Sequence, residues 1–112
     1  MELYLELQKL QSELQTSVRL LRKTGQAYAQ AERDYKVRLS QEVLKLKDEG
    51  MKVTLINVYI YGVREIADLR FKRDVAEVTY KANQENINSI KLQLRLIESQ
   101  MQREWSVAGR DL

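Results

Sequence analysis

The chain has 112 residues, of which 44% are hydrophobic and 31% charged, and its formal net charge is +3. It contains no cysteine and no histidine, which excludes a disulfide framework, thiol chemistry, histidine-ligated zinc and a Ser-His-Asp triad. It also contains no proline, whereas about 5% is usual, and this favours long uninterrupted helices.

An apolar seam in the first half of the chain predicts a helix over residues 2–47. Its members alternate spacings of three and four: Leu7, Leu10, Leu14, Ser17, Leu21, Thr24, Tyr28, Ala31 and Tyr35. The apolar positions then move to Leu39, Val43 and Leu46, an interruption that relaxes the expected supercoil. Gly50 is placed to end the helix in a left-handed conformation.

Residues 48–62 are predicted to form a tip. The β-branched and aromatic residues of 51–62 favour a strand by propensity, but a lone strand has no partner within the chain. Thr54 can instead cap a short helix over residues 55–61 that Gly62 ends. We expect the short helix, and a strand that pairs with its copy in a dimer is the alternative.

A second seam predicts a helix over residues 63–105, with Gly62 as its N-cap and Glu65 reaching back to the first amides. The residues 106–112 show no periodicity and are expected to be a frayed C-terminal tail. The members of the second seam are Ile66, Leu69, Arg73, Ala76, Tyr80, Asn83, Ile87, Ile90, Leu94, Ile97 and Met101.

Two helices of nearly equal length joined by a short tip predict an all-α fold. We expect a long antiparallel two-helix hairpin, similar to a coiled coil, that forms one domain over residues 1–105. Folding the chain about residue 56 brings apolar residues together along the pair. The facing residues are then Leu46 and Ile66, Tyr35 and Ala76, Leu21 and Ile90, Leu10 and Met101, and Leu7 and Trp105.

A second apolar stripe on the later helix contains Phe71, Val75, Val78 and Ala82, and further apolar residues lie off the seam. They are Val18, Val37, Leu44, Leu92 and Leu96. One hairpin has one seam and cannot bury two stripes, so we expect self-association into a helical bundle. A homo-oligomer, most simply a dimer, is predicted to have Phe71, Val75 and Val78 in its interface.

Two groups of charged residues are set apart by their positions. In the predicted register, two windows free of acids lie side by side and form a candidate basic patch that could contact phosphates or an acidic protein. The patch consists of Arg19, Arg22, Lys23, Lys91 and Arg95. Arg73 is a charge in a seam position and needs a carboxylate, for which Asp34 is the candidate. With Arg38 placed opposite Asp74, these four residues predict a structural ion-pair layer, and Asn83 near Tyr28 predicts a second polar layer.

No residue set predicts catalysis. Two carboxylate pairs have helical spacing, but both lie on one helix with no matching pair opposite, so neither predicts a metal site. The pairs are Glu65 with Asp68 and Asp74 with Glu77. The four glycines are too far apart for a phosphate loop. We therefore expect no enzyme, no cofactor and no metal.

Three segments carry a resemblance: Ala31–Tyr35, Arg70–Val78 and Arg103–Trp105. They resemble small helical proteins encoded by phages and prophages of Gram-positive bacteria, and the similarity covers residues 26–105. The resemblance implies a phage accessory or early protein, compatible with replication, recombination or interference with a host protein. That group has no active-site motif to transfer.

We therefore predict a non-enzymatic adaptor that docks on a host or phage protein through its apolar tip. The candidate docking residues are Ile56, Tyr59, Ile60 and Tyr61. The alternative is a nucleic-acid-binding protein of a phage replication or recombination module that uses the basic patch. No stretch approaches the roughly 18 apolar residues of a membrane span, and the N-terminus lacks the features of a signal peptide. A soluble protein in the bacterial cytoplasm, without a membrane partner, is the expectation.

Overall fold

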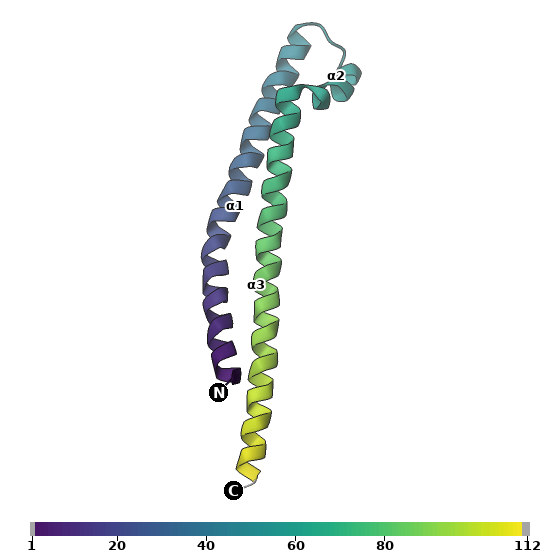
Figure 1. Cartoon of the computed structure of the whole chain (residues 1–112). Coiled ribbons are helices and arrows are strands. Elements are labelled where there is room, and N and C mark those ends of the chain that lie inside the picture. Colours follow the sequence, from purple (N-terminus) through teal and green to yellow (C-terminus); the bar gives the residue numbers. More distant parts are fainter. Residues whose placement is uncertain (1, 111–112) are drawn as a thin grey trace. The chain divides into compact units, whose positions relative to one another are not determined.

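The computed structural model describes residues 2–110, which form three α-helices and one 3₁₀ turn. In chain order these are α1 (Glu2–Asp48), α2 (Val53–Tyr59), η1 (Ile60–Gly62) and α3 (Arg64–Arg110). Figure 1 shows α1 and α3 running antiparallel to each other, with α2 and η1 joining them. The predicted all-α helical hairpin is confirmed, and none of the described residues forms a strand.

The hairpin divides into two compact units, each of which contains a part of both long helices. The terminal unit comprises Met1–Arg22 and Lys81–Leu112, and the tip unit comprises Lys23–Tyr80.

The core of the terminal unit follows the predicted seam. Leu10, Ile90, Leu94 and Ile97 are buried together, and partly buried apolar residues pack against them: Leu3, Leu7, Leu14 and Met101. A polar layer interrupts this core at the buried Ser17. Its backbone carbonyl accepts a hydrogen bond from Asn83 Nδ2 (3.0 Å), and its Oγ accepts one from Asn86 Nδ2 (2.7 Å). Asn83, predicted to form a polar layer near Tyr28, thus makes a polar contact across the hairpin, in which its partner is Ser17.

The core of the tip unit joins all four elements. Tyr35 and Leu46 of α1, Ile56 of α2, Ile60 of η1 and Ile66 of α3 are buried in one cluster. Partly buried residues pack around it: Leu39, Val43, Met51, Val63 and Leu69. The short helix predicted for the tip is thus confirmed, and it is bound to the hairpin core through Ile56 and Ile60.

Helix α1 ends as the sequence predicts. Gly50 adopts φ 87°, the left-handed conformation, without the steric cost that a Cβ would bring. The amides of Gly50 and Met51 donate to the carbonyls of Lys47 and Leu46, the two reciprocal bonds of a Schellman motif. Met51 also packs against the cluster that contains Leu46, so the motif turns the chain toward α2.

The two predicted N-caps are wrong. Helix α2 begins at Val53 after Lys52, whose carbonyl accepts from the amides of Leu55 and Ile56, so Thr54 lies within the first turn. Val63, with extended backbone, precedes α3, and its carbonyl accepts the first helical bond from Ala67. Burial of Val63 against the tip core outweighs side-chain capping here.

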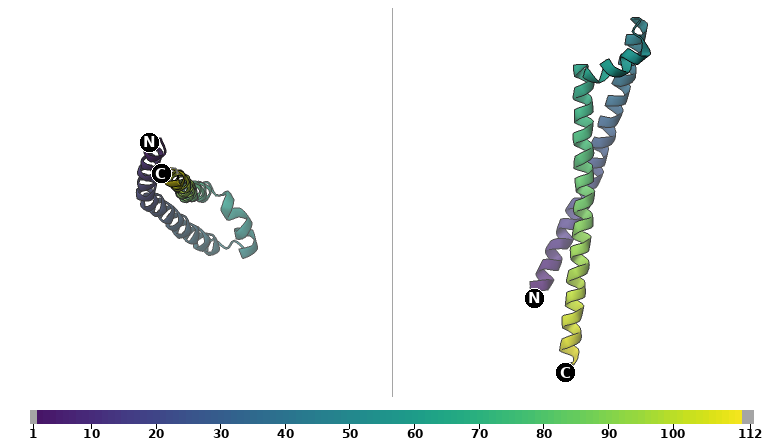
Figure 2. Two further views of the ribbon diagram at one scale, coloured as in Figure 1. Left: turned by 90° about the horizontal axis from the view of Figure 1, so that it is seen from below. Right: turned by 90° about the vertical axis from the view of Figure 1, so that its right-hand side faces the viewer.

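The register of the hairpin differs from a fold about residue 56. In the tip unit, Arg38 pairs with Glu65, whereas the predicted register placed Asp74 opposite it. In the terminal unit, Ser17 bonds to Asn86, whereas a fold about residue 56 places Arg95 there. The cause is the tip: α2 and η1 pack on the last turns of α1 and cross to α3, which therefore starts beside an earlier part of α1 (Figure 2).

Gly25 has a packing role in addition to its cost in helix propensity. A Cβ at this position would lie 3.2 Å from Cε1 of Tyr80, closer than ordinary contact. The Tyr80 ring also stacks at a tilt on Tyr28, with ring centroids 6.0 Å apart. Gly25 therefore admits an aromatic pair at a seam position.

The C-terminal boundary is also corrected. Helix α3 continues to Arg110, so the expected frayed tail is wrong for residues 106–110, and residues 111–112 lie outside the described part. Ser106, Val107 and Ala108 do not break a helix. Backbone hydrogen bonding therefore extends α3 beyond the last apolar residue of the seam. Trp105 lies largely exposed on this stretch.

Candidate functional site

Helix α2 has two apolar faces. Leu55, Val58 and Tyr59, at spacings of three and one, share one side of the helix, and all are exposed, with Val58 at 79%. Ile56 and Ile60 point the other way and are 1% and 2% exposed. The prediction that Ile56 and Ile60 are docking residues is thus wrong, because both belong to the core. Tyr59, also predicted, is accessible. We call Leu55, Val58 and Tyr59 the tip face.

The fourth predicted docking residue, Tyr61, lies beside the start of α3. It is partly exposed, and the guanidinium carbon of Arg70 lies 5.1 Å from its ring centroid. This cation–π contact holds the ring against α3. Tyr61 is therefore an accessible neighbour of the tip face with an intramolecular partner.

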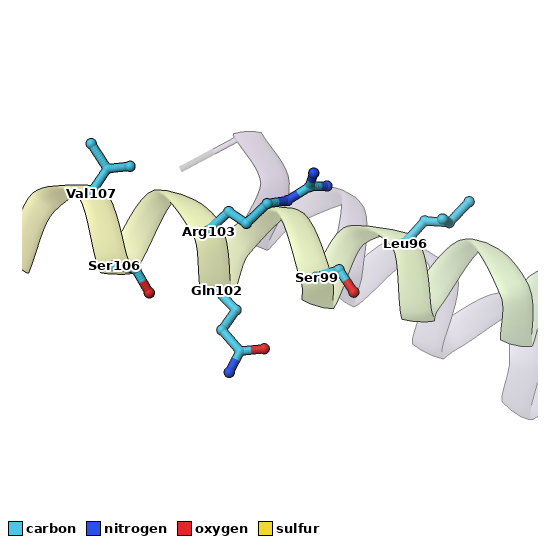
Figure 3. A pocket seen from close by; sticks show the side chains of 6 residues that line it. All are labelled: Leu96, Ser99, Gln102, Arg103, Ser106 and Val107. Carbon is cyan, nitrogen blue, oxygen red and sulfur yellow. The ribbon is translucent and has the colours of Figure 1, made fainter.

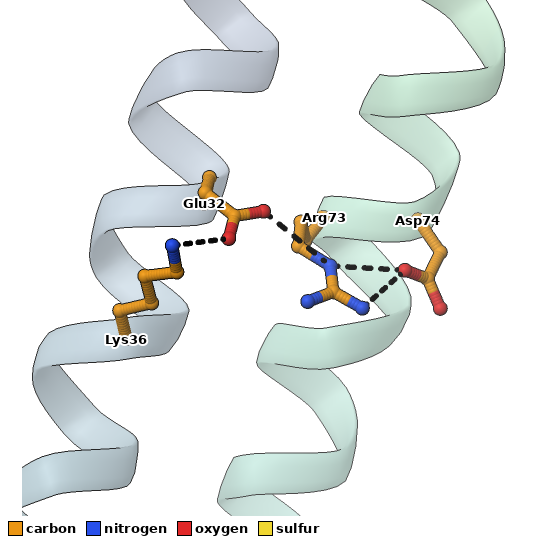
Figure 4. Close-up of polar contacts among 4 residues, drawn as sticks. All are labelled: Glu32, Lys36, Arg73 and Asp74. Carbon is orange, nitrogen blue, oxygen red and sulfur yellow. Dashed lines mark hydrogen bonds and ion pairs between the residues drawn. The ribbon is translucent and has the colours of Figure 1, made fainter.

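The ion-pair layer around Arg73 has different partners from those predicted. Arg73 donates from Nε and Nη2 to Asp74 Oδ1 at 3.0 and 2.8 Å, and its Nε lies 3.7 Å from Glu32 Oε2 (Figure 4). The guanidinium also lies 4.6 Å from the ring centroid of Tyr35. Hydrogen bonding from Arg73 to Asp74 is the main reason that the pKa of Arg73 is raised. Asp34 is not the partner; it accepts a hydrogen bond from Gln30 Nε2 at 2.8 Å.

Arg73 contacts Glu32 and not Asp34 because the two acids lie on different sides of the seam of α1. Glu32 and Asp34 flank the seam of α1 on opposite sides, and Arg73 reaches toward the side of Glu32. Glu32 is in turn 3.2 Å from Lys36 Nζ (Figure 4). Substitution of Asp34 therefore leaves the partners of Arg73 in place.

A second cluster joins α1 to α3 near the tip. Arg38 contacts Glu65 with two nitrogens, Nε at 2.9 Å and Nη2 at 3.0 Å, and its Nη1 lies 2.9 Å from Glu42 Oε2. Glu42 is only 5% exposed, and Oε2 has this ion pair but no well-aligned hydrogen bond within residues 2–110. Arg38 is thus paired with Glu42 and Glu65, and the predicted contact with Asp74 is wrong.

The electrostatics of this cluster follow from the geometry. The hydrogen bonds to Glu65, followed by the close contact with the Glu42 carboxylate, raise the pKa of Arg38. The same bonds from Arg38 lower the pKa of Glu65. The Arg38 guanidinium compensates the charge of the buried Glu42 carboxylate, and through Glu65 it links α1 to the first turn of α3.

Acid should therefore weaken the Arg38–Glu65 contact between α1 and α3. Because the folded-state pKa of Glu65 is lowered, the pair stabilises the protein above the ordinary glutamate pKa of about 4.3 and is lost as pH falls through the lower folded-state value. We expect Glu65→Gln to lower the melting temperature at pH 7 and to flatten its dependence on pH between about 5 and 3. Thermal melts monitored by circular dichroism test this, with Glu98→Gln, an exposed glutamate of the same helix, as control. Equal slopes for the wild type and Glu65→Gln would contradict the assignment.

The predicted basic patch consists of exposed side chains. Arg19, Arg22, Lys91 and Arg95 lie in the terminal unit, and Lys23 is the first residue of the tip unit. Arg19 Nη2 lies 3.4 Å from the Thr16 hydroxyl. Lys91 lines a shallow surface hollow of about 390 Å³ together with Leu21 and Glu85. Glu85 is next to Asn86, which bonds to Ser17 of α1, so the shifted register places an acid across from the start of the patch on α1. The expectation that two windows free of acids lie side by side is therefore wrong.

The stripe predicted for self-association is exposed. Phe71 is 72% exposed, Val78 is 67% exposed, and Val75 lies half exposed between them. On α1 of the same unit, Val37 and Leu44 are also exposed. The structure thus leaves apolar side chains uncovered on the outer sides of both long helices.

A surface hollow of about 800 Å³ lies near the C-terminal end of α3. Figure 3 shows the six side chains that line it, and all come from this one helix. They are Leu96, Ser99, Gln102, Arg103, Ser106 and Val107. Because a single helix surface supplies all of its lining, it does not enclose a small molecule. Within residues 2–110, no group of three or more acids is placed to hold a metal ion.

Sequence reasoning missed Glu42, although a signal was available. Continuing the alternation from Tyr35 by three and then four residues leads through Arg38 to Glu42, and four further residues lead to Leu46. The sequence prediction instead moved the seam to Val43, because Val43 is hydrophobic and Glu42 is charged. The seam of α1 therefore continues through the tip unit with a buried carboxylate in it.

Comparison with protein-family models, curated proteins and solved structures finds no match for this chain. None of the helices in residues 2–110 is long and apolar enough to span a membrane.

Proposed function

We propose that this chain is a non-enzymatic, phage-type accessory protein that acts as an adaptor in the cytoplasm of a bacterial host. The hairpin docks through its tip face onto a host or phage protein. The supporting observation is that Leu55, Val58 and Tyr59 are exposed on a helix whose other side is anchored by Ile56 and Ile60.

Preorganisation of α2 favours docking through the tip face. Apolar side chains at positions i, i+3 and i+4 of a helix are the usual anchors for a hydrophobic groove on a partner. The core beneath α2 already fixes its backbone, so less conformational entropy is lost on binding than for a flexible loop. An exposed tyrosine adds a large surface and a hydroxyl at such an interface.

Binding is expected to be lost when charge is placed on the tip face. Val58→Asp should abolish capture of the partner from a nuclease-treated host lysate, and titration of the purified partner should show at least a tenfold loss of affinity, about 1.4 kcal/mol or more. The matched control is Asn57→Asp, which adds the same charge on another side of α2. Retention of the partner by Val58→Asp would contradict the proposal.

The alternative function is nucleic-acid binding through the basic patch, which the exposure of its five cations favours. Changing all five to glutamine should then abolish binding to duplex DNA. The affinity of the wild type should fall with salt, with a log–log slope near −0.9 for each phosphate contact. Loss of the cellular partner only after nuclease treatment, with Val58→Asp unaffected, would establish this alternative in place of tip docking.

A further inference from the structure

The outer side of α3 carries a second heptad pattern. Phe71, Val75 and Val78 are separated by four and three residues, and Ala82 follows after four more on the same helix. Between these positions lie the seam residues Arg73, Ala76 and Tyr80, which face α1. The stripe therefore lies on a side of α3 that α1 does not cover, in agreement with its exposure.

The charges beside the stripe distinguish between possible partners. Asp74 and Lys81 lie on the same flank, seven residues apart. When two copies of a helix pair antiparallel, equivalent flanks face each other. Asp74 of one copy can then face Lys81 of the other, and the two-fold axis makes this contact twice.

Only one nearby register makes these contacts. It is centred between Val75 and Val78, so that Val75 faces Val78 and Phe71 faces Ala82 of the second copy. A shift of one heptad in one direction sets Asp74 against Asp74, and the opposite shift sets Lys81 against Lys81. A parallel pair aligns Asp74 with Thr79 and gains no ion pair.

The ends of this register are polar. Asp68 would face Glu85 of the second copy, with Lys72 and Lys81 one turn nearer the centre. Each end therefore gathers two acids and two bases around the apolar segment, as at the rim of an ordinary interface. A register two heptads farther along would instead place Ala82 and Glu85 at its centre and would set Val75 against Leu92.

We propose that a second copy of this chain covers the stripe, as an antiparallel α3–α3 pair centred between Val75 and Val78. The inference is independent of the proposed docking function. The dimer also determines where the docking surfaces lie. Because α2 and η1 precede α3, the two tip faces lie at opposite ends of the paired segment. The dimer is then a bivalent adaptor.

Cysteine cross-linking tests the register directly, because the natural chain contains no cysteine. Facing residues come close enough for a disulfide, whose Cα atoms are at most about 7 Å apart. We expect an oxidised mixture of Val75→Cys and Val78→Cys chains to form the mixed dimer in preference to either homodimer. A mixture of Val75→Cys and Leu92→Cys should not cross-link, and efficient cross-linking there would replace the proposed register with the distant one.

Sedimentation equilibrium of the uncross-linked full chain tests the interface itself. Lys81→Asp should raise the dimer Kd by at least about tenfold, and Asp74→Lys combined with Lys81→Asp should restore it. Leu44→Asp is the matched control, an exposed apolar residue of α1 in the tip unit, and should leave the Kd unchanged. A monomeric wild type at high micromolar concentration, or dissociation caused by Leu44→Asp alone, would overturn the proposal. Because none of these changes touches the tip face, failure here leaves tip docking to its own test.

Discussion

Ile56→Ala is expected to reduce the free energy of unfolding by about 3 kcal/mol, the usual cost of removing a fully buried isoleucine side chain. Ile56 is 1% exposed and belongs to the cluster that joins α1, α2, η1 and α3, so a cavity there weakens all four elements. Its neighbour provides the comparison: Leu55→Ala removes similar atoms from an exposed position and should change stability by no more than about 0.5 kcal/mol.

Urea denaturation followed by circular dichroism measures both variants, and equal m-values would show that the difference lies in stability. The contrast between adjacent residues checks that α2 packs with Ile56 inward and Leu55 outward. If the two variants were equally stable, the tip would not be anchored as described. The same result bears on function, because a tip face needs a fixed backbone beneath it.

Arg38→Met is the second large expected effect. It removes the guanidinium that lies 2.9 Å from Glu42 and leaves an uncompensated buried carboxylate, which costs about 3 kcal/mol. The double variant Arg38→Met and Glu42→Leu removes both charges from the seam and replaces them with apolar volume. It should recover most of the lost stability, since buried pairs often contribute little relative to hydrophobic replacements.

The double-mutant cycle separates the two effects by chemical denaturation of the four proteins at pH 7. Glu42→Leu alone should be close to the wild type, because Arg38 keeps its contacts with the exposed Glu65. If Arg38→Met were as stable as the wild type, Glu42 would not be a buried, guanidinium-dependent carboxylate. The cycle also gives a measure of how far this layer, and not the apolar seam, holds α1 to α3.

The positions of the two long helices and the side that each turns inward follow from the amino-acid pattern. Helical hydrogen bonds are local, and the alternation of threes and fours places Leu10 and Tyr35 on the inward stripe of α1 and Ile66 on that of α3, whatever the partner. Gly50 could be identified as the end of α1 because the left-handed conformation needs a residue without Cβ. The exposed stripe of Phe71, Val75 and Val78 was predicted for the same reason: it lies outside the period of the seam.

The register and the partners of the charged residues depend on how the elements pack. The register depends on how α2 packs against the end of α1, which sequence separation does not specify, and a shift of a few residues replaces Asp74 with Glu65 beside Arg38. The choice of Glu32 over Asp34 by Arg73 depends on which flank of α1 faces α3. The inward side of α2 was ambiguous, because apolar residues cover both of its faces and hydrophobicity does not distinguish them. Packing three elements around Ile56 and Ile60 resolved it, and left Leu55, Val58 and Tyr59 exposed to solvent.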